Sequence, residues 1–164
     1  MNQVQGVRPV SGVILALLSA MACWLLLQVM RSLGGDYPVI TWMGLVPLVG
    51  LAALVLVMCW QIRNYVRGKG TLRPSPQRGR GTLVGAQAAA LGGAALLGWY
   101  AANALVHLPD IDVPSQRVHL AWALVHAGAA LALSIAGYVG QAWCRIPPGE
   151  DDGDPAGEGD LAYG

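Results

Sequence analysis

The sequence has few charged residues for its length. They make up 12% of the 164 residues, whereas a soluble domain carries about 25%. Apolar residues make up 55%, so the chain lacks the polar surface that would cover a globule in water. This deficit excludes an ordinary soluble domain and indicates that lipid forms part of the solvent. The length is that of one domain.

The residue groupings that support catalysis or metal binding are also missing. A nucleophile, a base and an orienting residue do not occur together, and no glycine-rich phosphate loop precedes a helix. Cys23, Cys59 and Cys144 are too few and too scattered for a disulfide framework, and we expect them to be small core residues. We therefore expect no enzyme, no cofactor and no metal site.

Charge is absent as well from the interior of four long apolar runs. The runs cover residues 11–30, 39–62, 82–106 and 118–143. At 1.5 Å per residue, a helix of 20 residues spans about 30 Å, the thickness of the hydrocarbon core. None of the runs shows the alternation of a membrane strand, and a helix satisfies its own backbone in lipid. The sequence predicts an all-α membrane protein built as a bundle of four transmembrane helices.

A cleaved signal peptide is the alternative reading of the first run. Its apolar region would span about 7–15 residues and end at a small-residue cleavage site. The run at 11–30 is longer, and residues 31–35 (Arg-Ser-Leu-Gly-Gly) form a poor site. These features favour a span that stays in the protein.

The charges that are present are strongly segregated. Residues 63–81 hold six cations and no acid, and the segment 147–164 holds six acids and no cation. Lys and Arg favour the cytoplasmic side, and placing both termini there puts eight of the ten cations on it, Arg8 and Arg145 included. We predict a membrane domain over residues 1–146 with a basic cytoplasmic loop at 63–81. A disordered acidic cytoplasmic tail follows at 147–164.

Small residues recur every four positions in the last two runs. Because lipid tails are as apolar as Leu, helices in a membrane associate where small residues let their backbones approach. We expect the third and fourth helices to pack through the following positions: Gly81, Gly85, Ala89 and Gly93 on one, and Gly128, Ala132, Ala136 and Gly140 on the other.

Two further residues inside the runs are candidates for a special role. Pro47 cannot donate a backbone hydrogen bond, so it predicts a kink in the second helix. His126 is an ionisable group within the membrane, either hydrogen-bonded to a neighbouring helix or part of a proton relay. His119 is seven residues away, too far to share a metal ion, and we expect His107 and His119 at the wet interface.

The expected partners follow from the topology. Anionic lipid headgroups are the nearest partner of the basic loop, and we expect no nucleic acid. A second copy or another membrane protein is the expected protein partner. We expect a structural, assembly or regulatory membrane component, with a small oligomeric transporter or transporter subunit as the alternative. No carboxylate or cation lies inside a span, which counts against a pump or an ion channel.

Three segments carry a resemblance to a known family. They are the ending at 137–148 (Gly-Tyr-Val-Gly-Gln-Ala-Trp-Cys-Arg-Ile-Pro-Pro), the third run from Thr82 to Ala101, and the loop at 109–115. Over about residues 10–150 the chain resembles the small actinobacterial membrane proteins grouped as domain of unknown function 3180. The resemblance implies four helices in an actinobacterial plasma membrane and no assigned activity. Family genes often neighbour folate-biosynthesis genes, an association without a mechanism.

Overall fold

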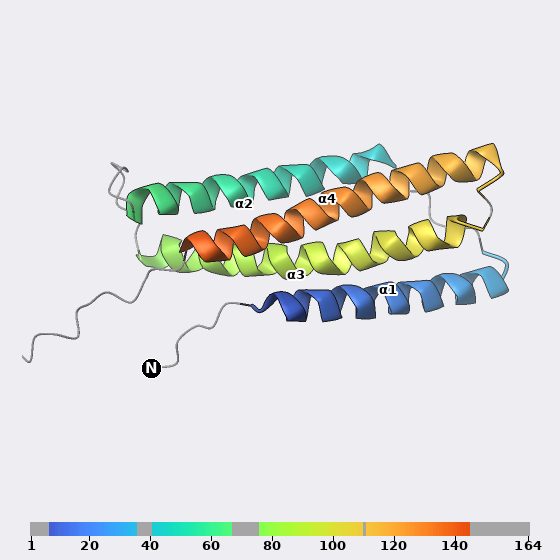
Figure 1. The fold of residues 1–164 in the computed structure, drawn as a ribbon, viewed down its shortest axis with the longest axis horizontal. Helices are drawn as coiled ribbons and strands as arrows, with labels where there is room; N and C mark the ends of the chain where they lie inside the picture. The colour runs from blue at the N-terminus through green and yellow to red at the C-terminus, as the bar shows by residue number, and fades with distance from the viewer. Residues whose placement is uncertain (1–6, 36–40, 67–75, 110, 145–164) are drawn as a thin grey trace, which may run out of the picture.

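The computed structural model describes residues 7–35, 41–66, 76–109 and 111–144 (Figure 1). Within these residues the chain forms four long helices and one short 3-10 helix: α1 (Pro9–Ser32), η1 (Trp42–Gly44), α2 (Leu45–Val66), α3 (Pro76–His107) and α4 (Pro114–Cys144). Four helical segments are long and apolar enough to cross a membrane. This confirms the prediction of an all-helical chain with four candidate membrane spans.

Local sequence signals explain where several helices begin and end. Proline stands at the first position of α1, α3 and α4. A backbone N–H at that position has no acceptor within the helix, so a proline there costs no hydrogen bond. At the end of α1, Gly34 adopts a φ of 76°, a left-handed conformation that favours glycine. The N–H of Gly35 then donates to the carbonyl of Met30 at 3.0 Å and the N–H of Gly34 to that of Arg31 at 3.1 Å. These two bonds close the helix as a Schellman cap.

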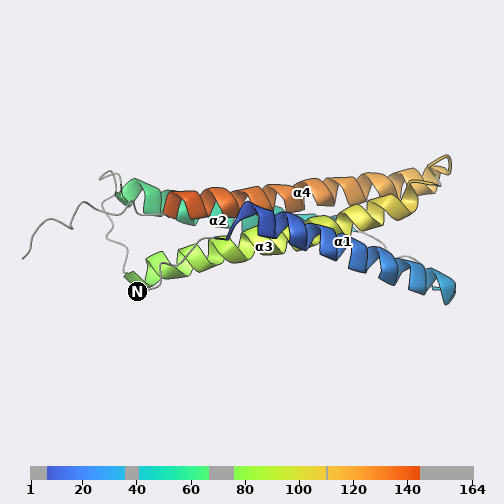
Figure 2. The ribbon, with the colours of Figure 1, turned by 60° about the horizontal axis from the view of Figure 1, so that its bottom comes forward.

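In the view of Figure 1 the helices form a row in the order α2, α4, α3, α1. α3 and α4 are the antiparallel central pair, α1 packs on α3, and α2 packs mainly on α4. Figure 2 shows α1 crossing α3 obliquely. We call the end that carries the α3–α4 hairpin the hairpin end. The end where α1 begins and α4 finishes is the terminal end.

Pro47 lies in the first turn of a helix and not in the middle of one. η1 covers Trp42–Gly44, and α2 begins at Leu45, so Pro47 is the third residue of α2. N–H groups in the first turn have no acceptor within their own helix, so a proline there breaks no hydrogen bond. The change from 3-10 to α-helix lies at Gly44, three residues before Pro47, and a kink at Pro47 stays a prediction.

The helices extend further than the apolar runs. α2 continues to Val66 and α3 starts at Pro76, so both enter the segment 63–81 that was predicted to be a loop. Apolar content shows where the hydrocarbon ends, but a helix satisfies its backbone beyond that level too. The middle of the basic loop, residues 67–75, and the acidic tail lie outside the described residues.

Candidate functional site

The contact between α3 and α4 is made by two short series of small residues. A side chain added to Gly93 would reach the backbone of α4, with its Cβ 2.5 Å from the nitrogen of Ser134 and 2.9 Å from the carbonyl oxygen of Ala130. A Cβ on Gly137 would lie 2.6 Å from the carbonyl oxygen of Ala86. The two backbones therefore touch where glycine provides the space.

A hydrogen bond crosses the same interface. The hydroxyl of Ser134 donates to the carbonyl of Ala90 at 2.9 Å, and both residues are buried. The bond joins the two glycine contacts, because Ala90 also lies against Gly137. Ser134 was not singled out in the sequence, where a serine in an apolar run gives no sign of its partner.

The structure separates the eight predicted packing residues into two groups. The buried ones are Ala89, Gly93, Ala136 and Gly140. The exposed ones are Gly81, Gly85, Gly128 and Ala132. At each exposed glycine an added Cβ would meet nothing within 4 Å. The four-residue series thus run into the interface at one end and out of it at the other.

Helix geometry explains this division. Four residues turn an α-helix by about 400°, so each step moves the next residue about 40° around the axis. Three steps move it about 120°, which takes the end of a series off the contact face. The interface follows spacings of four and then three residues: Ala86, Ala90 and Gly93 on α3, and Ala130, Ser134 and Gly137 on α4.

α1 is attached to α3 by one close crossing and two polar contacts. A Cβ on Gly98 would lie 2.8 Å from the nitrogen of Ala20. The hydroxyl of Ser19 donates to the carbonyl of Ala95 at 2.7 Å. Further along, the buried amide of Asn103 donates to the carbonyl of Trp99 at 2.9 Å and contacts the sulfur of Cys23. These contacts fix the position of α1 along α3.

His126 is a fully buried ionisable side chain in the structure. Its exposed fraction is 0%, and its Nδ1 lies 2.8 Å from the carbonyl oxygen of Trp122. A carbonyl only accepts hydrogen bonds, so Nδ1 carries the proton, and in a neutral imidazole Nε2 then offers a bare lone pair. That Nε2 is buried and has no hydrogen-bond partner among the residues that the structure describes.

The unpartnered Nε2 lies beside the start of α2. A Cβ on Gly44 would be 3.3 Å from Nε2 and 3.8 Å from the hydroxyl oxygen of Tyr100. The ring of Tyr100 also packs on the imidazole, with centroids 5.0 Å apart. The structure thus places His126 beside Gly44, the last residue of η1, three residues before Pro47.

Two other buried polar atoms near the terminal end have no hydrogen-bond partner within the described part of the chain. They are the hydroxyl of Tyr138 and the Nε2 of Gln141, one turn apart on α4. The other amide atom of Gln141, Oε1, accepts a bond from the N–H of Val7 at 2.9 Å. Gly12 of α1 lies directly against the hydroxyl of Tyr138. Here the beginning of α1 reaches across to α4.

The hairpin end gathers polar side chains that are distant along the chain. His107 is buried against neighbouring residues, with 6% exposed, and its level at the wet interface stays a prediction. Its Nδ1 lies 2.6 Å from the Oε1 of Gln116, and its ring stacks on that of His119 with centroids 5.6 Å apart. The α3–α4 hairpin creates this pair, which the spacing within one helix did not reveal.

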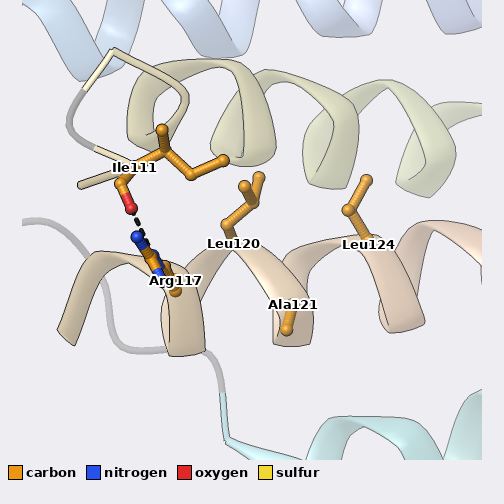
Figure 3. Close-up of a pocket in the computed structure, with 5 residues that line it drawn as sticks. All are labelled: Ile111, Arg117, Leu120, Ala121 and Leu124. Atoms are coloured by element: carbon orange, nitrogen blue, oxygen red, sulfur yellow. Dashed lines mark hydrogen bonds between the residues drawn. The ribbon is translucent and has the colours of Figure 1, made fainter. Parts of the chain in front are cut away.

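A small groove lies at the same end of the molecule (Figure 3). It is lined by Ile111, Arg117, Leu120, Ala121 and Leu124 and has a volume of about 300 Å³. The Nε of Arg117 donates to the carbonyl of Ile111 at 2.7 Å, which holds the guanidinium at one end of the groove. Leu120 and Leu124 point to the same side of α4.

The terminal end of α2 packs on the end of α4. Cys59 is fully buried, and a Cβ on Gly140 would lie 2.7 Å from its sulfur. Cys144 packs on the cluster that contains Cys59, and the guanidinium of Arg63 lies 4.7 Å from the ring centre of Trp143. All three cysteines are free thiols. In the part of the chain that the structure describes, no three His, Cys, Asp or Glu residues are grouped to hold a metal ion.

Comparison with known proteins identifies the family of the chain but no activity. No curated protein and no solved structure matches it. A family described as protein of unknown function (DUF3180) matches residues 13–148, which is most of the chain and covers all four candidate spans except for residues 9–12 of the first. The chain is therefore a multi-pass membrane protein that belongs to the DUF3180 family of proteins of unknown function.

Proposed function

We propose that the protein is a non-enzymatic component of the plasma membrane that holds or regulates a partner membrane protein. Both termini and the basic segment 63–81 face the cytoplasm in this proposal, because eight of the ten cations then avoid translocation. The basic segment rests on anionic lipid headgroups. A second copy of the chain is the other partner that we consider.

The observation that supports this proposal is the open row of helices. α1 and α2 flank the central pair on different sides, and in each of them only 17% of the most apolar stretch is buried by the chain. Large side chains on both helices, such as Leu17 at 64% and Val46 at 62%, are exposed. Faces of this kind are available to lipid or to the helices of another protein.

Site-directed photo-crosslinking in native membranes tests the partner. A photoreactive residue replaces Leu17 on α1 or Val46 on α2, both exposed, and the large buried side chain of Leu133 on α4 provides the control position. We expect a discrete adduct from an exposed position and none beyond the chain itself from Leu133. Adducts with lipid alone from both exposed positions would contradict a stable protein partner.

Labelling of single cysteines tests the orientation. Asp112→Cys lies at the hairpin end and Arg8→Cys at the terminal end, and both residues are exposed. With a membrane-impermeant maleimide on intact cells, we expect labelling at 112 and protection at 8 until the cells are opened. The reverse pattern would overturn the proposed orientation.

A small transporter remains a second candidate because of His126. Its buried, unpartnered Nε2 lies beside Gly44, where the second span changes from 3-10 to α-helix. Transporters bind their substrates and ions at such irregular helices, and ionisable groups within the membrane mark proton pathways. A bare imidazole lone pair is able to accept a proton.

Proton flux in liposomes distinguishes this candidate. Purified protein is reconstituted with an internal pH-sensitive dye, and a potassium diffusion potential drives protons inward. If the protein transports protons through His126, the dye responds with the native protein and with His119→Gln but not with His126→Phe. A native protein that gives no more flux than empty liposomes would eliminate it and leave the first proposal in place.

A further inference from the structure

The groove at the hairpin end combines an apolar wall with a fixed cation. Leu120 and Leu124 form the wall together with Ile111 and Ala121, and Arg117 stands at one end (Figure 3). Leu124 and Ile111 are 56% and 42% exposed, so the groove opens towards the surroundings of the helix. Its volume of about 300 Å³ is at the lower end for small-molecule sites.

The position of the groove along α4 matches the edge of a bilayer. α4 has 31 residues and is therefore about 46 Å long, against a hydrocarbon core of about 30 Å. A centred helix then extends about five residues beyond the core at each end. Arg117, the fourth residue of α4, lies at headgroup level. Leu124 is about 10 Å deeper, among the acyl chains.

The charge of Arg117 is available to a ligand. Its Nε bond to Ile111 orients the guanidinium but leaves its other N–H groups without a hydrogen bond or ion pair among the described residues. The nearby carboxylate of Asp112, which follows Ile111 on the hairpin, forms no ion pair with Arg117. A planar guanidinium held in this way matches the two oxygens of a phosphate group.

We propose that this groove binds one glycerophospholipid, with the lipid phosphate on Arg117 and the upper part of one acyl chain along Leu120 and Leu124. The occupant follows from the arrangement, because a cation at headgroup level with an apolar wall below it is complementary to a lipid phosphate and its chain. The site lies at the opposite end of the molecule from the end of α2 and the start of α3, which flank the basic loop. It does not depend on the partner proposed above.

Native mass spectrometry of the full chain in mild detergent tests the site. Phosphatidylglycerol is added to the native protein, to Arg117→Gln and to Arg31→Gln. Arg31 is an exposed arginine in the last turn of α1, at the same end of the molecule, and does not line this groove. A surface cation adds about 1 kcal/mol, so we expect about fivefold less bound lipid for Arg117→Gln and no change for Arg31→Gln.

Further variants separate the phosphate contact from the hairpin bond. Arg117→Lys keeps the charge and should retain more lipid than Arg117→Gln, provided thermal unfolding shows that both variants fold. Leu124→Gln should weaken binding, and Leu131→Gln, an exposed leucine two turns further along α4, should not.

Two additional ligands separate the headgroup from the chain. Diacylglycerol lacks the phosphate and glycerol 3-phosphate lacks the chains, so each should bind less than phosphatidylglycerol. Equal binding of diacylglycerol and phosphatidylglycerol, or equal losses in the Arg117→Gln and Arg31→Gln variants, would overturn the proposal.

Discussion

In the central pair, 44% of the most apolar stretch of α3 and 39% of that of α4 are buried by the chain, whereas the share is 17% in α1 and in α2. The more apolar helices are the less buried ones, because mean hydropathy is 2.4 for the first two spans and 1.4 and 1.7 for the last two. This reverses the pattern of a soluble protein, in which the most apolar segments occupy the core.

The reversal follows from the solvent. In lipid, moving a leucine from the surface to a helix contact gains little, so close backbone packing and hydrogen bonds decide which helices associate. The α3–α4 contact accordingly uses Ala, Gly and Ser, whereas Leu, Val and Met cover the exposed faces of α1 and α2. Small side chains, and not large apolar ones, therefore bring α3 and α4 together as the central pair.

Adding a single methyl group to the central contact should have the largest effect. Gly93→Ala and Gly137→Ala each place a Cβ within 3 Å of the opposite backbone, so the helices must separate. We expect a loss of about 1–3 kcal/mol in the free energy of unfolding. Thermal unfolding in detergent, followed by tryptophan fluorescence, measures it.

Matched glycines on the same two helices provide the control. Gly92 and Gly128 have nothing within 4 Å of an added Cβ. Alanine is the better helix former by about 1 kcal/mol, so Gly92→Ala and Gly128→Ala should leave stability unchanged or raise it. Equal destabilisation by Gly92→Ala and Gly93→Ala would mean that α3 packs on α4 through another face.

The sequence predicted the helices better than their contacts. Length and hydropathy identify a span because the bilayer imposes both. They do not identify the contact face, because alanine and glycine occur all around α3 and α4, and only the crossing geometry selects Gly93 over Gly92. The surroundings of His126 were unpredictable for the same reason, since Gly44 and Tyr100 come from two other helices.

Loosening one flanking helix should leave the other in place. The effect on stability should be smaller than that of the changes in the central pair. Gly98→Ala pushes α1 off α3, and Gly140→Ala pushes α2 off α4, since a Cβ would meet Ala20 in one case and Cys59 in the other. Cys23 at 3% exposure and Cys59 at 0% report on the two contacts. We expect Gly98→Ala to speed the labelling of Cys23 by N-ethylmaleimide, and Gly140→Ala to speed that of Cys59.

Each variant serves as the control for the other. Because α1 contacts mainly α3 and α2 contacts mainly α4, loosening one flank should leave the other cysteine protected. Peptide mass spectrometry after timed labelling follows both thiols in one sample. If either variant exposed both cysteines together, the four helices would unfold as one unit, and the contrast between centre and flanks would not hold.

The smallest effect should come from the hydrogen bonds that cross between helices. Ser134→Ala removes the bond to Ala90 in the central pair, and Ser19→Ala removes the bond to Ala95 at the flank. Bonds of this kind contribute about 0.6 kcal/mol on average in membranes, so we expect each change to lower stability by about that amount. Among the described residues, the Ser32 hydroxyl bonds only to Val29 within its own helix, and Ser32→Ala should have no such effect. Similar losses in the centre and at the flank would show that backbone proximity, and not hydrogen bonding, distinguishes α3 and α4 from their neighbours. A much larger loss for Ser134→Ala would instead assign part of that distinction to the buried hydroxyl.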